Sequence, residues 1–446
     1  VDRLTEELSL RHDVRQILKS VGDLERLTSK ASSGRINPRE LGHIRRGLIA
    51  VQEIADLTAG EDALLPFLER LSPCGALLDR LQRELVEDPA TSIGKGEVIA
   101  EGVDAPLDEV RNLAFHSQEA LDAIRDREAE VTGISGLKIA FNNVFGYYLE
   151  VRNAHKDKVP EAWIRKQTLT QAERYITEEL KTLETQILSA KEQAEALEQK
   201  AFASLVAACV ADISKLMSNA RAIGLLDMLA SHAETAVDLG YTRPRMNEEQ
   251  GLHITEGRHP VIERQLPVGE TYVANDVGLH PDNRQILMVT GPNMSGKSAL
   301  LRQTALIALM AQSGSFVPAK SADLGILDRI FTRVGASDNI SSGESTFMVE
   351  MNETAAILNH LTERSLVLLD EIGRGTSTYD GVSIAWAIAE HLHESNRVRP
   401  LTLFATHYHE LNDMSQRFSR IVNVNVSVKE LDGNIVFLRK LAPGGS

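Results

Sequence analysis

A run of eight residues in the second half of the chain has the spacing of a loop that binds phosphate. It fits the pattern GxxxxGK(S/T), follows an apolar run and opens a helical pattern, which is the context that this motif requires. The glycines let backbone N–H groups turn toward phosphate oxygens, and the helix start adds a favourable dipole. Lys297 would reach the β- and γ-phosphates of ATP, and Ser298 would ligate Mg²⁺. The predicted nucleotide-binding residues are Gly291, Pro292, Asn293, Met294, Ser295, Gly296, Lys297 and Ser298.

Two carboxylates and a histidine follow two further apolar runs. Asp370 and Glu371 come directly after one such run, and His407 follows the other. Asp370 would hold the magnesium through its water shell, and Glu371 would polarise the attacking water. His407 is in a position to sense the γ-phosphate, although a lone histidine there is more often structural. Because open α/β sheets bind ligands beyond the carboxyl ends of their strands, we expect these groups to converge with Lys297 at one edge.

A run of mostly small residues at 341–347 precedes a helical pattern at 348–358. Their N–H groups and hydroxyls would form a second anion-binding helix start. One subunit cannot easily aim both this start and the phosphate loop at the same nucleotide. The working hypothesis is therefore a dimer with composite ATP sites, and the alternative is an ordinary helix N-cap.

The spacing of apolar residues divides the chain into helical and α/β parts. In residues 1–130 apolar residues recur at helical spacing. Asn37 precedes a proline, which predicts a helix start there. In residues 136–152 apolar and polar residues alternate, which predicts two strands joined by a turn. Residues 177–237 form one long helical pattern, with a break expected near Gly224. From residue 246 onward apolar runs alternate with helices, which indicates a parallel sheet covered on both faces.

The charge of the chain is unevenly distributed. A net charge of −15 counts against nucleic-acid binding only if that charge is spread evenly. Between residues 138 and 174 basic residues outnumber acidic ones, and such local fields decide contact with phosphate. A solvated surface is the alternative. The candidate DNA-binding residues are Arg152, Lys156, Lys158, Arg165, Lys166 and Arg174, with Arg165 and Lys166 as first choices.

Composition disfavours several other classes of protein. No apolar run approaches the roughly 18 residues of a membrane-spanning helix, and the first residues have no signal-peptide pattern. We therefore expect a cytoplasmic protein with no membrane partner. Cys74 and Cys209 lie far apart without CxxC spacing or neighbouring histidines, which predicts buried free thiols rather than a disulfide framework or a zinc site.

Several motifs together resemble the MutS family of bacterial mismatch-repair ATPases. They are TGPNMSGKS at 290–298, FTRVGASDN at 331–339, SGESTFMVEM at 342–351, LDEIGRGTS at 369–377 and FATHYHEL at 404–411. Similar runs upstream are GRHP at 257–260, GYYL at 146–149, QTLTQAERY at 167–175 and VGDLER at 21–26, so the resemblance covers essentially the whole chain. The family usually has threonine where this chain has Ala299. Because Ser298 is the expected Mg²⁺ ligand, we expect no loss of Mg²⁺ binding from alanine at position 299.

The resemblance implies a fold class, an activity and partners. The fold class is α plus α/β, multidomain: a helical lever bundle (1–125), a small β-containing clamp insertion that touches the backbone of duplex DNA (126–186), a long returning lever helix (187–245) and an ABC-type P-loop α/β ATPase domain (246–446). ATP/ADP and Mg²⁺ are the implied cofactors. A homodimer through the ATPase domains and a MutL-type repair partner are implied as well.

The resemblance also assigns roles to single residues and to missing regions. By position, Tyr272 would stack on adenine, His259 would belong to the nucleotide site, and Ser345 would act in trans. The mismatch-recognition and connector domains of the family, and its C-terminal helix-turn-helix, would lie outside this sequence. We therefore expect a fragment that binds DNA weakly and without mismatch preference, through backbone charge alone.

Two other hypotheses remain at this stage. One is another ABC-class DNA machine of the Rad50 or SMC type. Its coiled-coil arm would interrupt the ATPase between the phosphate loop and the signature, whereas here the long helices all precede Gly291. The other is a nucleotide-binding scaffold whose hydrolysis is impaired because dimerisation is weak.

Overall fold

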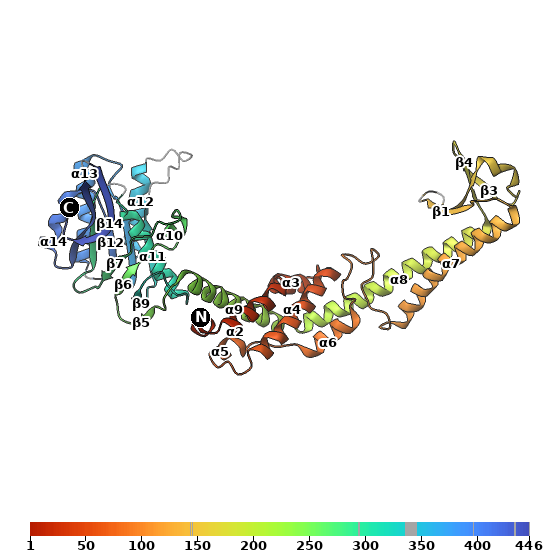
Figure 1. Ribbon diagram of the computed structural model, residues 1–446, viewed down its shortest axis with the longest axis horizontal. Coiled ribbons are helices and arrows are strands. Elements are labelled where there is room, and N and C mark those ends of the chain that lie inside the picture. The colour runs from red at the N-terminus through yellow and green to blue at the C-terminus, as the bar shows by residue number, and fades with distance from the viewer. Residues whose placement is uncertain are drawn as a thin grey trace. The chain divides into compact units, whose positions relative to one another are not determined.

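The chain forms two compact units that mix helices and sheets. The computed structural model describes residues 1–142, 144, 146–292, 295–334, 346–395, 397–431 and 434–445. One unit comprises residues 13–226, and the other joins residues 1–12 to residues 227–446 (Figure 1). The division into four domains expected from the sequence stays a prediction.

The unit of residues 13–226 is built mainly from helices. They are α2 (Leu8–Ser20), α3 (Leu24–Ser32), α4 (Pro38–Leu57), α5 (Leu65–Leu68), α6 (Gly75–Glu84), α7 (Ala105–Thr132), α8 (Glu178–Ala211) and the first half of α9 (Ile213–Leu239). Leucines and isoleucines at helical spacing, such as Leu41, Ile44 and Leu48, are fully buried. The apolar stripes seen in the sequence therefore form the core of this unit.

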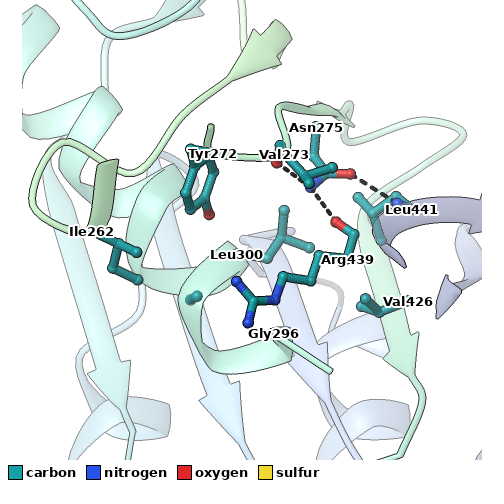
Figure 2. A pocket seen from close by; sticks show the side chains of 10 residues that line it. Ile262, Tyr272, Val273, Asn275, Gly296, Leu300, Val426, Arg439 and Leu441 are labelled. Carbon is teal, nitrogen blue, oxygen red and sulfur yellow. Dashed lines mark hydrogen bonds between the residues drawn. The ribbon is translucent and has the colours of Figure 1, made fainter. Parts of the chain in front are cut away.

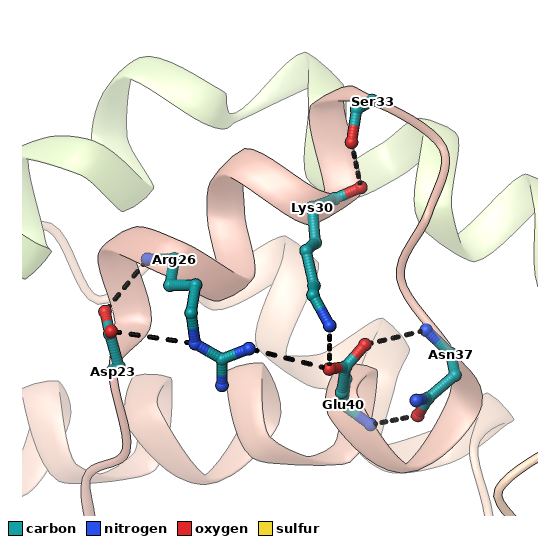
Figure 3. Close-up of polar contacts among 6 residues, drawn as sticks. All are labelled: Asp23, Arg26, Lys30, Ser33, Asn37 and Glu40. Atoms are coloured by element: carbon teal, nitrogen blue, oxygen red, sulfur yellow. Dashed lines mark hydrogen bonds and ion pairs between the residues drawn. The ribbon is translucent and has the colours of Figure 1, made fainter.

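Polar side chains fix where α3 and α4 begin (Figure 3). The Asn37 side chain accepts a hydrogen bond from the Glu40 backbone N–H, and the Glu40 carboxylate accepts one from the Asn37 N–H. At α3 the Asp23 side chain accepts a single hydrogen bond, from the N–H of Arg26. Such bonds satisfy N–H groups that a helix start leaves free. The helix start predicted at Asn37 is confirmed.

A four-stranded sheet is inserted between α7 and α8. Its strands are β1 (Lys138–Asn142), β2 (Gly146–Arg152), β3 (Ile164–Thr168) and β4 (Ala172–Ile176), in the order β1-β2-β4-β3, with a short helix η1 (Asn153–Lys158) after β2. The pairing of β1 with β2 is antiparallel, which confirms the hairpin. One face of the sheet packs on α7 and α8 through a core that includes Leu149, Tyr175 and Ile187.

The long helical pattern is broken at a different place from the one expected. α8 ends at Ala211 and α9 begins at Ile213, with a bend of 67° between them. The expected break at Gly224 was wrong, because a single glycine in a helix interior is tolerated. Asp212 ends α8, and its carbonyl accepts the first hydrogen bonds of α9, from the N–H groups of Lys215 and Leu216.

Among the described residues, no single helix is long and apolar enough to cross a membrane. The bent pair of α8 and α9 passes the same test by length and composition only.

The second unit contains a six-stranded sheet. Its strands are β8 (Ile286–Thr290), β10 (Arg329–Arg333), β11 (Ser365–Asp370), β12 (Leu401–Ala405), β13 (Ile421–Leu431) and β14 (Asn434–Pro443), in the order β10-β11-β12-β8-β13-β14. The first five are parallel, and β14 is antiparallel to β13. The three strands predicted from apolar runs are confirmed as β8, β11 and β12.

Helices and a second sheet cover both faces of the six-stranded sheet. Alternate residues of β8 enter two separate cores, Leu287 into one and Met288 into the other. The first core includes Leu301 of α11 (Lys297–Gln312), and the second includes Ala385 of α13 (Thr378–Glu394). This two-sided burial explains why these strands are continuous apolar runs.

The remaining elements complete this unit. They are α1 (Asp2–Glu6), β5 (Arg245–Asn247), β6 (Leu252–Gly257), α10 (Ile262–Gln265), β7 (Asn275–Leu279), β9 (Ser321–Gly325), α12 (Thr346–Asn359), η3 (His409–Asp413) and α14 (Met414–Arg417). The four strands form a sheet of their own in the order β5-β9-β6-β7.

Candidate active site

Three neighbouring strands end together at one edge of the six-stranded sheet. Asp370 is paired in register with Ala405 of β12, and Ala405 with Val289 of β8. Because adjacent strands lie about 4.8 Å apart, the backbones of Asp370 and Val289 are roughly 10 Å apart. The phosphate loop therefore begins at the edge where the Asp370 and Glu371 carboxylates emerge.

Lys297 lies at the start of α11, and its ammonium group is inside the phosphate loop. Its Nζ donates to the Gly291 carbonyl at 2.7 Å and to the Pro292 carbonyl at 3.1 Å. Burial lowers the pKa of Lys297, while the nearby Glu371 and Asp370 carboxylates raise it. The positive φ of 107° at Gly296 lets the loop turn directly into the helix. Asn293 and Met294 lie outside the described residues.

The Asp370 carboxylate has unused capacity to bind a ligand. Its Oδ1 is buried and has no hydrogen-bond partner among the described residues. Burial raises the pKa of Asp370, a hydrogen bond with the Ser298 side chain lowers it, and the Glu371 charge raises it. Ser298 and Asp370 therefore meet at the sheet edge. A buried, unpaired carboxylate oxygen beside a hydroxyl is a donor set that fits Mg²⁺.

Glu371 has an unusual backbone conformation. Its φ is 53°, and a non-glycine residue in this left-handed region costs about 1–3 kcal/mol. Its N–H donates to the Ala405 carbonyl at 2.9 Å, which holds the turn against β12. The carboxylate is one-fifth exposed, and its Oε2 accepts from the Arg374 guanidinium at 2.7 Å. Glu371 thus leaves the strand end in a fixed turn and keeps access to solvent.

His407 follows β12 at the same edge. Its side chain is exposed, and its ring lies 4.2 Å from the ring of Tyr408. Thr406, the residue before it, is buried and donates its N–H to the Val289 carbonyl. No contact of His407 within the described residues tests its predicted role as a sensor of the γ-phosphate, which stays a prediction. Ser345, predicted to act in trans, lies outside the described residues.

A cavity of about 260 Å³ adjoins the phosphate loop at Gly296 (Figure 2). Tyr272 forms part of its wall, and its hydroxyl donates to Gln303 Oε1 at 3.0 Å. Burial raises the pKa of Tyr272 to about 12, so the phenol is neutral. The other residues that line the cavity are Ile262, Val273, Asn275, Ala299, Leu300, Val426, Arg439 and Leu441. The wall is mostly apolar, with one cationic side chain, that of Arg439.

His259 is near this cavity but does not line it. Its Nδ1 accepts the N–H groups of Val261 and Ile262 at 3.2 and 3.3 Å. Burial lowers the pKa of His259, which keeps this nitrogen available as an acceptor. His259 therefore orders the start of α10, and Ile262 of that helix lines the cavity.

Sequence reasoning missed Arg439. Its side chain runs into the cavity toward Gly296, as Figure 2 shows. Asn275 of β7 holds the strand there, because it donates to the Arg439 carbonyl and accepts from the Leu441 N–H. The only signal in the sequence was a lone arginine in a β-like run. Arg439 belongs to no motif, so its place in the cavity wall could not be predicted without the fold.

The six basic candidates in the inserted sheet and its short helix η1 have different surroundings. Arg174 is half-buried, lies 4.4 Å from the Tyr148 ring and donates to Gln167 Oε1. Lys158 donates to the Gly133 carbonyl, and Arg165 pairs with Glu173. Within the described part of the chain, three exposed candidates make no ion pair or hydrogen bond: Arg152, Lys156 and Lys166.

Comparisons with known proteins agree on one family. Residues 287–446 match MutS domain V, and residues 102–193 match MutS family domain IV. The DNA mismatch repair protein MutS of Christiangramia forsetii is 56% identical over 449 residues, which cover 100% of this chain and 51% of the relative. The namesake of Flavobacterium psychrophilum is 57% identical over 97% of this chain and 50% of the relative.

The chain belongs to the MutS family. It spans about half the length of the curated relatives that it matches. The MutS domain V match contains the phosphate loop, Asp370, Glu371 and Arg439. The MutS domain IV match contains all six basic candidates. Tyr272 and His259 lie between the two matched ranges.

Proposed function

We propose that this chain provides half of an ATP-hydrolysing site, of the ABC class, that drives a clamp on duplex DNA in mismatch repair. The strongest support is the common end of β8, β12 and β11, where Lys297, Asp370 and Glu371 meet. Membership of the MutS family supports the mismatch-repair part of the proposal.

The proposed reaction is the attack of water on the γ-phosphate of ATP, which releases ADP and phosphate. Phosphoryl transfer needs mainly positioning and neutralisation of charge. Lys297 exchanges its loop carbonyl partners for oxygens of the β- and γ-phosphates. Glu371 orients the attacking water and accepts its proton, and His407 contacts the γ-phosphate. Ser298 and Asp370 would hold Mg²⁺, and the bound ion would supply positive charge to the phosphates.

The cavity beside Gly296 receives the adenine base in this proposal. The Tyr272 ring stacks on it, and the Arg439 guanidinium covers another face, since both groups line the same cavity. Stacking on aromatic rings and on arginine tolerates any base shape. His259 contributes by holding α10, and hence Ile262, against the cavity.

A second copy completes the site. Ser345 would approach the γ-phosphate of the neighbouring subunit, which makes hydrolysis depend on a homodimer through the ATPase domains. The basic residues of the inserted sheet would contact DNA phosphates. A MutL-type partner and a cytoplasmic location complete the proposal, by family membership.

The proposal is tested by the ATP hydrolysis rate per subunit over a wide range of protein concentration. The rate per subunit should rise as dimers form. Glu371→Gln should lower kcat by about 10²- to 10⁴-fold and leave ATP binding intact. Glu363→Gln is the matched control, because this exposed carboxylate precedes the opposite end of the same strand. A rate that is flat and near zero while ATP still binds would instead support the hydrolysis-impaired scaffold.

DNA binding is tested separately by fluorescence anisotropy. Binding should be weak and should not distinguish a matched duplex from a mismatched one. A clear mismatch preference at physiological salt would contradict this part of the proposal.

A further inference from the structure

Two side chains from different elements hold the peptide that follows Glu371. The Gly373 N–H donates to the carboxylate of Glu350 on α12, and the Gly373 carbonyl accepts from the Tyr408 hydroxyl at 3.0 Å. Both side chains belong to buried residues, each 5% exposed. We call Glu350, Tyr408, Gly373 and Gly381 the Gly373 brace.

The two glycines of the brace are required by its close contacts. Gly373 has a φ of 86°, and a Cβ on it would lie 2.7 Å from the Gly381 Cα. A Cβ on Gly381 would lie 2.2 Å from the Tyr408 hydroxyl and 2.6 Å from the Gly373 carbonyl oxygen. These distances are shorter than any real Cβ contact, so a side chain at either position would push the brace apart.

The backbone is fixed both at the strained residue Glu371 and two residues later, at Gly373. The Glu371 N–H is bonded to the Ala405 carbonyl, and Gly373 is fixed by Glu350 and Tyr408. A positive φ at a non-glycine residue persists only where its surroundings over-determine it. The brace therefore supplies the second of two anchors that hold Glu371 in its turn.

We infer that Glu350 is a positioning residue, which sets the direction of the Glu371 carboxylate through the Gly373 brace. A buried carboxylate is costly unless it makes good hydrogen bonds, so filling space alone does not explain a glutamate here. Its observed bond is with the Gly373 N–H, two residues after Glu371. This inference rests on the proposed hydrolysis at Glu371.

The brace also ties the turn to α12. Glu350 lies one helical turn after Thr346, the first residue of α12, so the brace joins this helix to the turn that follows β11.

The test compares Glu350→Ala, Glu350→Gln and Tyr408→Phe, with Asn352→Ala on the exposed face of α12 as control. Glu350→Ala and Tyr408→Phe should lower kcat by about 10- to 100-fold and change the Kd of ATP by less than about threefold. Glu350→Gln keeps an acceptor oxygen and should restore most of the rate. Asn352→Ala should behave as wild type.

Hydrogen exchange gives a second readout that does not need turnover. Peptides that contain residues 372–375 should exchange faster in Glu350→Ala, whereas peptides from β8 should be unchanged. A wild-type kcat in both Glu350→Ala and Tyr408→Phe, or unchanged exchange, would overturn the inference. A wild type that hydrolyses nothing at any concentration would instead reject the proposed function, and the exchange measurement would still test the brace. If Glu350→Ala does not fold, Tyr408→Phe and Glu350→Gln decide.

Discussion

At the scale of single residues, the candidate phosphate site brings a buried ammonium close to two carboxylates of opposite charge. Lys297 is buried within the loop, and its ammonium is stabilised by two carbonyls and by the fields of Asp370 and Glu371. Burial of Asp370 raises its pKa while Ser298 lowers it. Burial removes water from Lys297 and Asp370, and Asp370 Oδ1 has no hydrogen-bond partner among the described residues. Such a site is poised for a ligand that carries both negative phosphates and a divalent cation.

The sequence predicted these residues because each one follows an apolar run within a recognisable motif. Arg439 was missed for the opposite reason. It reaches the cavity only because Asn275 of β7 fixes the backbone of β14, and the two residues are far apart in the chain. Long-range contacts of this kind leave no local pattern in a single sequence.

Substitution of Tyr272 tests the proposal that the cavity beside Gly296 binds adenine. Tyr272→Ala should weaken ATP binding by about 1–3 kcal/mol, which is the usual value of stacking between a base and an aromatic ring. Tyr272→Phe is the matched control, because it keeps the ring and loses only the bond to Gln303. Titration with a fluorescent ATP analogue measures both. Equal affinity for the alanine and phenylalanine variants would place the base elsewhere.

The two cysteines allow a prediction about pH. Burial raises the pKa of Cys74, and burial followed by the Asp212 charge raises the pKa of Cys209 to about 12. Because the thiolate is the reactive form, ionisation alone should slow modification of native Cys209 at pH 8 on the order of a thousandfold relative to the unfolded chain. Above the unfolded thiol pKa of about 8.5, proton release favours the unfolded state, so this contribution to stability falls as pH rises.

Ellman's reagent at pH 8, with and without urea, measures these thiol rates. Both thiols should react slowly in the native protein and fast in urea. Two fast native thiols would show that the helical unit does not bury them.

At the scale of elements, strands and helices were predicted correctly where the spacing of apolar residues was clear. The strands β8, β11 and β12 were predicted because both of their faces are buried, and the hairpin of β1 and β2 because its residues alternate. The bend between α8 and α9 was misplaced. It depends on the carbonyl of Asp212 starting a new helix, whereas Gly224 fits within α9 with open space around it.

The start of α4 provides a stability prediction at this scale. Asn37→Ala removes the side-chain acceptor for the Glu40 N–H and should lower the free energy of unfolding by about 0.5–2 kcal/mol. Asn37→Asp keeps an acceptor and should stay close to wild type. Urea denaturation followed by circular dichroism measures the difference. Equal midpoints for the alanine and aspartate variants would mean that the cap contributes nothing.

At the scale of the whole molecule, charge is separated along the chain rather than balanced. The net charge is −15, yet Arg152 and Lys166 of the inserted sheet and Lys156 of the adjoining η1 are exposed. The structure also changes the first choices among the basic candidates. Arg165 is partly neutralised by Glu173, and Arg174 is held within the sheet by Tyr148 and Gln167. Phosphate contact is therefore expected first from the exposed groups that make no ion pair; the Lys156 charge acts on Glu173 only at longer range, where it is a minor cause of the lowered pKa of that carboxyl.

The salt dependence of DNA binding tests this assignment. The double variant Lys156→Ala with Lys166→Ala should lower the slope of log Kd against log salt by about 2, because each phosphate contact contributes roughly one counterion. A matched control is Lys19→Ala with Lys95→Ala, which removes the same charge from exposed positions elsewhere in the helical unit. The control should leave the slope unchanged, since distant charges are screened at working salt concentrations. If both double variants lower the slope equally, binding follows net charge alone, and the inserted sheet is not the DNA contact.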